Sequence, residues 1–351
     1  MTTVTLGGSI HSALTHFALL GLAEIAESTF GAGVTLGWSD AAVPRAWVEV
    51  PGASEDEVAQ AVLDAARTES PRDWPSVRLT YASGATVSPF SPRIKAIDTD
   101  KHPNDWEKHQ AERHIVFDAL LEAGDWTELR WLDALGEASY WHVANNVRQP
   151  DRGASRWEMV SRQHGREFVS NRYSLICKEV ARWPKKQVID GVTGVQVRDV
   201  IGKQKTASRS STGLTPPGPA DNALVFCALR GIAAFPLAHR VEEINATPGA
   251  WPATVLHPKS MLLPVPTAPV TPARLRSVLV SSQLADLHTA MMTIDSDQEN
   301  RKSLALEADA ARAWLAARMC RAVVRFPILK AGSDSAPERQ VLEGEVHLNV
   351  R

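Results

Sequence analysis

The residues best suited to binding chemistry in this chain are the cations between residues 148 and 209. This stretch holds fourteen Lys and Arg against six Asp and Glu. A guanidinium group is planar and permanently charged, which suits it to contacts with phosphate oxygens. The predicted nucleic-acid-binding residues are Arg156, Arg162, Arg166, Asn171, Arg172, Lys203, Lys205 and Arg209. The pattern favours a polyanion as the partner, and an ordinary solvated basic surface is the alternative.

The charge of the chain is unevenly distributed along its length. Residues 1–147 hold ten Lys and Arg against twenty-one Asp and Glu, while residues 210–351 are almost balanced, with fourteen against thirteen. The formal net charge of −2 therefore hides an acidic front and a basic middle. Charge separated in this way produces a local field that can steer a polyanion, whatever the total charge.

Two tryptophans, Trp157 and Trp183, lie within the basic stretch. An indole face can stack on an unpaired base, which would suit a nucleic-acid partner. An indole also buries a large apolar area, so packing in the core is the alternative and is favoured for both side chains.

Sequence motifs give no catalytic residue and no cofactor. Gly202–Lys203 looks like the end of a phosphate-binding loop, but that loop needs Gly where Val197 stands and Ser or Thr where Gln204 stands. Neither G-x-G-x-x-G nor G-x-S-x-G occurs. A pair of carboxylates brought together by folding stays open, because spacing in sequence does not fix spacing in space.

No metal site is predicted either. The pairs His11/His16 and His109/His114 are five residues apart, which does not place two ligands on one helix face. No Cys-x-x-Cys occurs, and the cysteines are expected to be buried, reduced thiols: Cys177, Cys227 and Cys320.

Composition points to a folded protein of the cytoplasm with no membrane partner. Apolar residues make up 44% of the chain and charged residues 22%. No window approaches the roughly eighteen uninterrupted apolar residues of a membrane span. The N-terminal sequence has no basic segment before its apolar part, and Glu24 and Glu27 follow, which argues against a secretory signal.

The elements that must position these residues begin with an α+β layer. Apolar residues spaced by three and four predict a helix over 11–28. Two short apolar runs, 34–38 and 46–50, predict a hairpin. Ser54 opens a capping box, S-E-D-E, for a helix that runs to about Arg67.

The middle of the chain combines predicted helices with loops. Helices are expected over 106–123 and 127–135. Ser155 to Glu158 spells another capping box, and an amphipathic helix is expected from Val169 to Trp183. Residues 202–218 are rich in Ser, Thr, Gly and Pro and are expected to form a mobile loop.

The remainder is expected to be mostly helical. Asp221 can cap a helix that reaches Ile232, and Thr271 with Pro272 marks the start of another. A last helix is predicted over 304–324, followed by a hairpin between 328–329 and 346–348.

The predicted fold class of the whole chain is therefore α+β. The predicted division is an acidic domain (1–147), a basic segment with its loop (148–213) and a mainly helical C-terminal domain (214–351).

Three stretches, in their order, carry a resemblance to a known family. They read SIHSALTHFALLGLAEIAE, SRWEMVSRQHGREFVSNR and SRSSTGLTPPGPADNALVFCALRGIAAFPLA. Together they resemble the large-subunit-like protein of the type I-G (formerly I-U) CRISPR interference complex, or Cascade, along most of the chain. The resemblance carries over no fixed catalytic motif, in agreement with the motif search.

The resemblance implies a noncatalytic subunit of an RNA-guided complex. Such a subunit is expected to recognise the protospacer-adjacent motif and hold the displaced strand of target DNA. Its expected partners are the backbone and guide-processing subunits, the guide RNA, the target DNA and a helicase-nuclease. Two alternatives remain: a soluble enzyme, either a nuclease or a hydrolase, with an unrecognised site, and a protein-interaction module.

Overall fold

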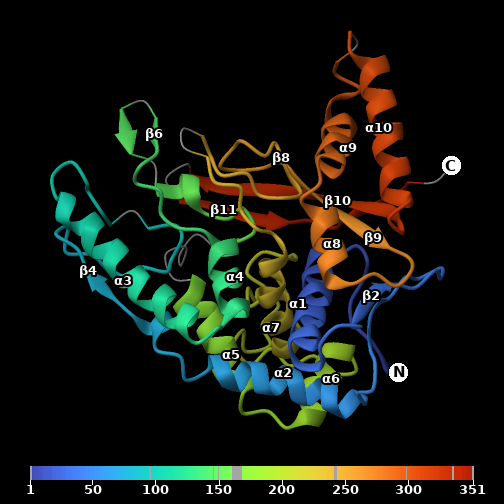
Figure 1. Cartoon of the computed structure of the whole chain (residues 1–351), viewed down its shortest axis with the longest axis horizontal. Coiled ribbons are helices and arrows are strands. Elements are labelled where there is room, and N and C mark those ends of the chain that lie inside the picture. Colours follow the sequence, from blue (N-terminus) through green and yellow to red (C-terminus); the bar gives the residue numbers. More distant parts are fainter. Residues whose placement is uncertain are drawn as a thin grey trace.

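The computed structural model describes residues 2–94, 96–144, 146–148, 150–159, 168–240, 243–297, 299–333 and 336–349. It is an α+β fold, as predicted from the sequence. Figure 1 shows most helices gathered around α1 and α7, with the larger antiparallel sheet across one side of them. The helices α9 and α10 project from that sheet, and α3 forms an arm on the opposite side of the molecule.

The N-terminal elements are β1 (Thr2–Thr5), α1 (Ala13–Phe30), β2 (Thr35–Trp38), β3 (Ala46–Val50) and α2 (Glu55–Glu69). The strands form an antiparallel sheet in the order β1-β3-β2. Both halves of the capping box before α2 are present, since Ser54 and Glu57 exchange side-chain and backbone hydrogen bonds. The predicted helix–hairpin–helix layer is therefore confirmed.

The middle elements are mostly short. They are η1 (Trp74–Ser76), β4 (Leu79–Thr80), β5 (Thr86–Val87), α3 (Pro103–Glu122), α4 (Trp126–Leu135), β6 (Val143–Ala144), β7 (Val147–Arg148), η2 (Pro150–Gly153), η3 (Val169–Tyr173), α5 (Ser174–Val180) and α6 (Lys185–Thr193). The two helices predicted near residues 106 and 127 correspond to α3 and α4. The single amphipathic helix predicted over Val169–Trp183 is a π-helical turn, η3, continued by α5.

The C-terminal elements combine helices with a sheet. They are α7 (Asn222–Arg230), η4 (Gly231–Ala234), β8 (Ala250–Trp251), β9 (Ser260–Pro266), α8 (Pro272–Leu279), α9 (Ser282–Thr293), α10 (Arg301–Ala316), β10 (Cys320–Ser333), β11 (Ala336–Val341) and β12 (Glu345–Leu348). The sheet has the order β11-β10-β9-β8, and β12 also pairs with β10. Asp221 and Thr271 cap α7 and α8, as predicted.

The predicted end of the last helix is wrong. The helix α10 stops at Ala316, and residues from Cys320 belong to β10, the longest strand of the sheet. An apolar run of this length does not by itself distinguish a helix from a buried strand. Pairing with β9, in which Val324 lies opposite Leu263, gives Cys320–Val324 its strand conformation. The C-terminal part therefore contains a five-stranded sheet where only a terminal hairpin was expected.

The core is built around α1, whose residues from Ala13 to Ala26 are all buried. The helices α1 and α7 approach closely because Gly21 has no side chain. A Cβ built on Gly21 would lie 1.8 Å from the carbonyl oxygen of Cys227. One hydrophobic cluster contains residues from Val4 to Val341 and draws on all three predicted parts. The division of the chain into those parts remains a prediction.

Candidate nucleic-acid interface

The loop from Asp199 to Asp221 carries the exposed cations of the predicted site. Asp199 is fully buried and holds the loop at both ends. Its carboxylate accepts hydrogen bonds from the backbone amide of Gly202 (2.8 Å) and from the side-chain amide of Asn222 (3.2 Å). The loop is closed further along by a bond from the Gly218 amide to the Ser208 carbonyl, at 2.9 Å. Buried polar anchors therefore fix a segment that contains no helix or strand.

Lys203 and Lys205 lie exposed on this loop. The backbone of Lys203 is left-handed, with φ at 56°, which is a strained conformation for a residue with a side chain. The turn is closed by the backbone bond from Gln204 to the carbonyl of Asp199, at 2.9 Å. This geometry presents two ammonium groups to solvent from a short, anchored turn.

Arg172 and Arg209 line a narrow recess beside the same loop. Its other walls are formed by the segment from Ser211 to Pro217 and by Arg339 and Gln340 of β11. The recess has a volume of about 10 Å³, which is room for a single water-sized group. Arg209 forms an ion pair with Glu338, the residue next to Arg339 on β11.

The charged side chains that line the recess are all arginines. Partial burial lowers the pKa of Arg172, and the nearby cation Arg209 lowers it further, while Asp199 opposes both effects. Arg339 is buried behind the recess, and its two terminal nitrogens donate to the carbonyl oxygens of Arg156 and Glu158, at 3.1 and 2.9 Å. Three arginines therefore line the recess, with Glu338 paired to Arg209, Asp199 near Arg172 and Glu158 near Arg339.

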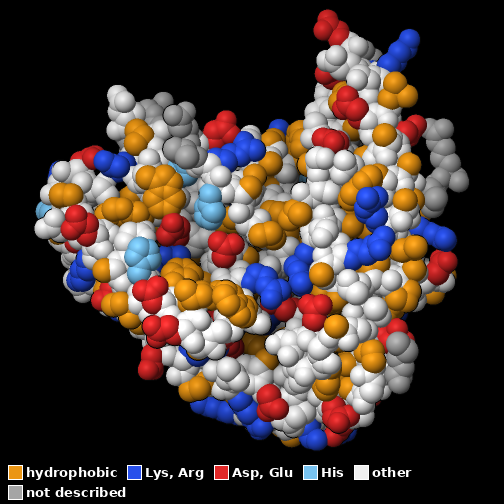
Figure 2. Space-filling model, viewed as in Figure 1, with side chains coloured by type: hydrophobic (Ala, Val, Ile, Leu, Met, Phe, Trp, Pro, Cys, Tyr) orange, Lys and Arg blue, Asp and Glu red, His pale blue; other side chains and the backbone are white. Residues whose placement is uncertain are grey.

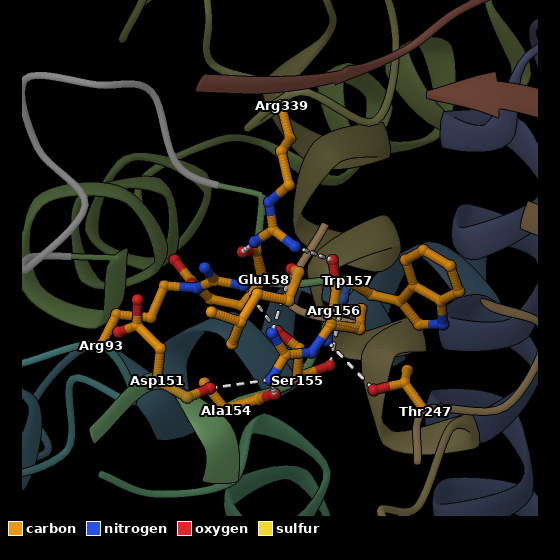
Figure 3. A network of polar contacts seen from close by, with 10 residues as sticks. Arg93, Asp151, Ala154, Ser155, Arg156, Trp157, Glu158, Thr247 and Arg339 are labelled. Carbon is orange, nitrogen blue, oxygen red and sulfur yellow. Dashed lines mark hydrogen bonds and ion pairs between the residues drawn. The ribbon is translucent and has the colours of Figure 1, made fainter. Parts of the chain in front are cut away.

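Arg156 does not belong to this surface, which corrects its assignment as a nucleic-acid contact. Its side chain is fully buried, and its guanidinium donates to the carbonyl oxygens of Ala154 (2.6 Å), Asp151 (2.8 Å) and Leu256 (3.1 Å). Figure 3 shows this guanidinium turned toward Asp151 and Ala154, inside the polar network. A phosphate cannot reach it in this structure.

The capping-box spelling Ser155–Glu158 does not start a helix. Glu158 is instead buried and accepts a hydrogen bond from Nε of Arg93 at 2.5 Å, as Figure 3 shows. Residues of the right type at N-cap and N3 indicate a helix only when the chain can continue as one. Here tertiary partners use the same side chains as part of a buried ionic network.

The remaining predicted residues have different outcomes. Arg162 and Arg166 lie outside the described residues. Asn171 and Arg172 are partly buried on the π-helical turn η3. The structure therefore brings Arg172 and Arg209 together at the recess, with Lys203 and Lys205 on the same loop as Arg209, and separates Arg156 from them.

The two tryptophans of the basic stretch are core residues. Trp157 is fully buried and donates from Nε1 to the carbonyl oxygen of Pro248 at 3.0 Å. Trp183 is also buried and donates from Nε1 to a carboxylate oxygen of Glu179 at 2.9 Å. The favoured interpretation, core packing, is confirmed for both, and base stacking on these two rings is not possible in this structure.

Sequence reasoning missed two hydroxyl groups at the recess, those of Ser211 and Thr212. Both side chains are buried, and neither hydroxyl has a hydrogen-bond partner among the described residues. A signal was available, because the run Ser-Ser-Thr-Gly directly follows Arg209. By itself this run indicates only a loop, because hydroxyl-rich runs are common in turns.

A second site that the sequence did not reveal is a pocket of about 420 Å³ between α1 and α2. Its lining combines apolar side chains with Glu69, Arg72 and Arg230. Nε of Arg72 lies 3.0 Å from the carboxylate of Glu69. Burial, followed by the charge of Glu128, raises the pKa of Glu69 to about 7. Local spacing can pair Glu69 only with Arg72, three residues away, and folding alone brings Arg230 to them.

Three further searches gave negative results. Among the described residues, no three or more His, Cys, Asp and Glu side chains are grouped as metal ligands. Within the same residues, no helix has both the length and the apolar character to cross a membrane. Comparison with known proteins gives no match to a family model, to a curated protein or to a solved structure.

Proposed function

We propose that this protein is a noncatalytic subunit of a cytoplasmic, RNA-guided CRISPR effector complex and helps to bind target DNA. The observation that carries the proposal is the anchored loop, which presents Lys203, Lys205 and Arg209 together at the surface. The resemblance of the three sequence stretches supports the family. Its partners would be backbone and guide-processing subunits, guide RNA, target DNA at the protospacer-adjacent motif and displaced strand, and a helicase-nuclease.

The arrangement of charge suits such a subunit. In RNA-guided recognition, base pairing reads the sequence, while the protein contacts a short duplex motif and the phosphate backbone. Phosphate contacts need cations on a surface, and they position the nucleic acid without specifying its sequence. Figure 2 shows Lys and Arg side chains extending from the middle of this face toward the side of the molecule that carries α8.

The test is assembly followed by DNA titration. Expression with candidate partner subunits and a guide RNA should give a complex that retains this chain. In that complex, Lys203→Gln with Lys205→Gln should lower the slope of log affinity against log salt by roughly 0.9 per lost contact with duplex DNA. Lys302→Gln, an exposed cation at the start of the projecting α10, is the matched control. An unchanged slope in the double variant, or failure to retain guide RNA, would contradict the proposal.

The pocket between α1 and α2 favours a second candidate, a hydrolytic enzyme. A carboxyl group with a pKa near 7 at the edge of a pocket suits general acid–base catalysis. Incubation of the purified chain with labelled single-stranded DNA and with an activated ester, from pH 6 to 8, tests this candidate. Turnover that Glu69→Gln abolishes would support it, and absence of turnover on both substrates would count against it.

A further inference from the structure

We propose that the recess between Arg172, Arg209, Ser211 and Thr212 is a binding site for one phosphate group. The source of that phosphate, a nucleic-acid backbone, rests on the proposed function. The claim that the recess binds an anion is independent of the proposed function, because it follows from the side chains that line the recess. One phosphate oxygen would enter the recess, and the others would remain at its mouth between the two guanidinium groups.

The hydroxyl groups give the first reason. Ser211 is 1% exposed and Thr212 is 3% exposed, and both line the recess. Neither hydroxyl has a partner among the described residues. A buried polar group without a hydrogen bond reduces stability, so such groups point to a ligand that satisfies them. The nearby hydroxyls of Ser208 and Ser210 differ, because they bond to each other at 3.3 Å.

The arginines give the second reason. Arg209 is close enough to Arg172 for its charge to lower the pKa of Arg172, and the buried Arg339 also lines the recess. The carboxylates that act on the two arginines at the mouth are Glu338, paired with Arg209, and the buried Asp199, which holds the loop, while Glu158 and Asp151 act on Arg339. A phosphate would take the place of the Glu338 carboxylate at Arg209. It offers oxygens to both guanidinium groups at once, which a single monodentate carboxylate does not.

The backbone gives the third reason, because it holds the recess in shape before any ligand arrives. Gly213 has φ at 86°, and a Cβ at this position would lie 2.7 Å from the carbonyl oxygen of Arg339. Its own carbonyl accepts a hydrogen bond from the amide of Val341 in β11 at 2.8 Å. The next carbonyl, that of Leu214, accepts one from the amide of Leu14 at the start of α1, at 3.1 Å. The turn is thus clamped between β11 and α1, which reduces the ordering cost of binding.

The size of the recess selects the ligand. A volume of about 10 Å³ admits one water-sized group, so an oxygen of a tetrahedral oxyanion fits at its base. A nucleobase or a sugar ring does not. The chemistry is therefore that of a phosphate, taken either from a nucleic-acid backbone or from a free phosphate in solution.

The experiment begins with inorganic phosphate as the probe, at constant ionic strength. A ligand that binds only the folded state raises the melting temperature in a saturable manner. Ser211→Ala should weaken phosphate binding roughly tenfold, because a hydrogen bond to a charged ligand is lost. The same variant should melt at the same or a higher temperature without phosphate, since an unsatisfied buried hydroxyl is removed. A purely structural serine would give the opposite result.

Arg172→Gln is the second variant, and it should weaken phosphate binding at least as much. Ser210→Ala is the matched control, because its hydroxyl is buried nearby but has a partner, and it should leave phosphate affinity unchanged. The site is overturned if wild-type protein shows no saturable phosphate effect, or if Ser211→Ala and Arg172→Gln leave the effect intact.

A single-stranded oligothymidylate then distinguishes the source. If both variants weaken the binding of the oligonucleotide and of phosphate in parallel, the site holds a backbone phosphate and both proposals stand. If phosphate binds and the variants weaken it, but neither the chain nor its assembled complex binds the oligonucleotide, the recess is a free-anion site and the proposed function fails. If the oligonucleotide binds and is insensitive to both variants and to added phosphate, the phosphate site is overturned while the proposed function survives.

Discussion

Two buried ionic clusters in this protein have opposite charge compositions. The carboxylate cluster consists of Glu24, Glu69 and Glu128 around Arg230, with Arg72 at its edge. The arginine cluster consists of Arg93, Arg156 and Arg339 around Glu158. The first joins α1, α2, α4 and α7, and the second joins a loop from the front and a loop from the middle of the chain to β11.

The two clusters satisfy their charges in different ways. Each arginine of the second cluster donates to backbone carbonyl oxygens, as Arg156 does three times. Figure 3 shows these side chains directed toward one stretch of backbone. A guanidinium has five donors, so peptide carbonyls can balance part of its charge. A carboxylate accepts only, and the carboxylate cluster relies on Arg230, on Arg72 beside Glu69, on Arg130 near Glu24, or on a proton.

Burial among other carboxylates explains why the pKa of Glu69 is raised. Arg230 donates to Glu128 at 2.6 Å and to the hydroxyl of Tyr173 at 3.0 Å, and its guanidinium also lies over the ring of Trp131. Three buried carboxylates share this central arginine, and Arg72 and Arg130 at the edge pair with Glu69 and Glu24. Burial and the neighbouring Glu128 therefore raise the pKa of Glu69 to about 7. Excess negative charge is relieved by protonation, a route that arginine does not have.

Replacing Arg230 with Met should produce the largest effect. It would leave three carboxylates buried without their central cation, and breaking a buried ion pair in this way costs about 3–5 kcal/mol. Urea denaturation at pH 7.5 measures the loss in the free energy of unfolding. Arg67→Met, which removes an exposed cation paired with Asp64, is the control and should change it by less than about 1 kcal/mol. If the two variants lost the same free energy of unfolding, Arg230 would not be stabilising the three carboxylates.

Glu158→Gln should cost less, under about 2 kcal/mol, because burial raises the pKa of Glu158 to about 7 and the amide removes the cost of burying its charge. The bond from Arg93 would weaken, yet Arg339 would still donate to the backbone carbonyl of residue 158, and the contacts of Arg156 would be kept. The same denaturation experiment applies, with Glu179→Gln on α5 as a control outside the cluster. A loss greater than that of Arg230→Met would show that the carbonyl groups do not compensate the arginines.

Glu69→Gln should stabilise the protein at high pH. The folded-state pKa of about 7 lies above the usual 4.5, so folding favours the protonated form. The stability contributed by that proton is complete below pH 4.5 and is lost as the pH rises to 7. At pH 8 the variant should exceed the wild type by up to about 3 kcal/mol, and near pH 4.5 the difference should vanish. Unfolding free energies across this range measure it, and parallel pH curves for the two proteins would contradict it.

Lys203→Gln and Lys205→Gln should have the smallest effect on stability, within about 0.5 kcal/mol. Both side chains are exposed and belong to neither cluster. Melting curves at low and high salt measure the change, and Asp199→Asn, at the buried anchor of the same loop, is the contrasting variant. A large loss from the lysine variants would mean that the loop depends on its cations and not on Asp199.

Local signals in the sequence predicted several elements well. Ser54, Asp221 and Thr271 are helix caps whose side chains bond the first turn of α2, α7 and α8, so the signal and the structure rest on the same few residues. The α1 helix and the β2–β3 hairpin followed from apolar periodicity. The recess also lies beside predicted residues, since Arg172 and Arg209 were both proposed from the sequence.

Other features were decided only by tertiary structure. Cys320–Val324 reads as the end of a helix and becomes a strand because β9 lies beside it. Arg156 reads as a surface cation and is buried because the carbonyl group of Leu256, a hundred residues away, joins those of Asp151 and Ala154 around its guanidinium. Ser211 reads as loop composition and becomes a candidate ligand because Arg172 stands opposite. In each case the deciding partner is remote in sequence, and local spacing carries no information about it.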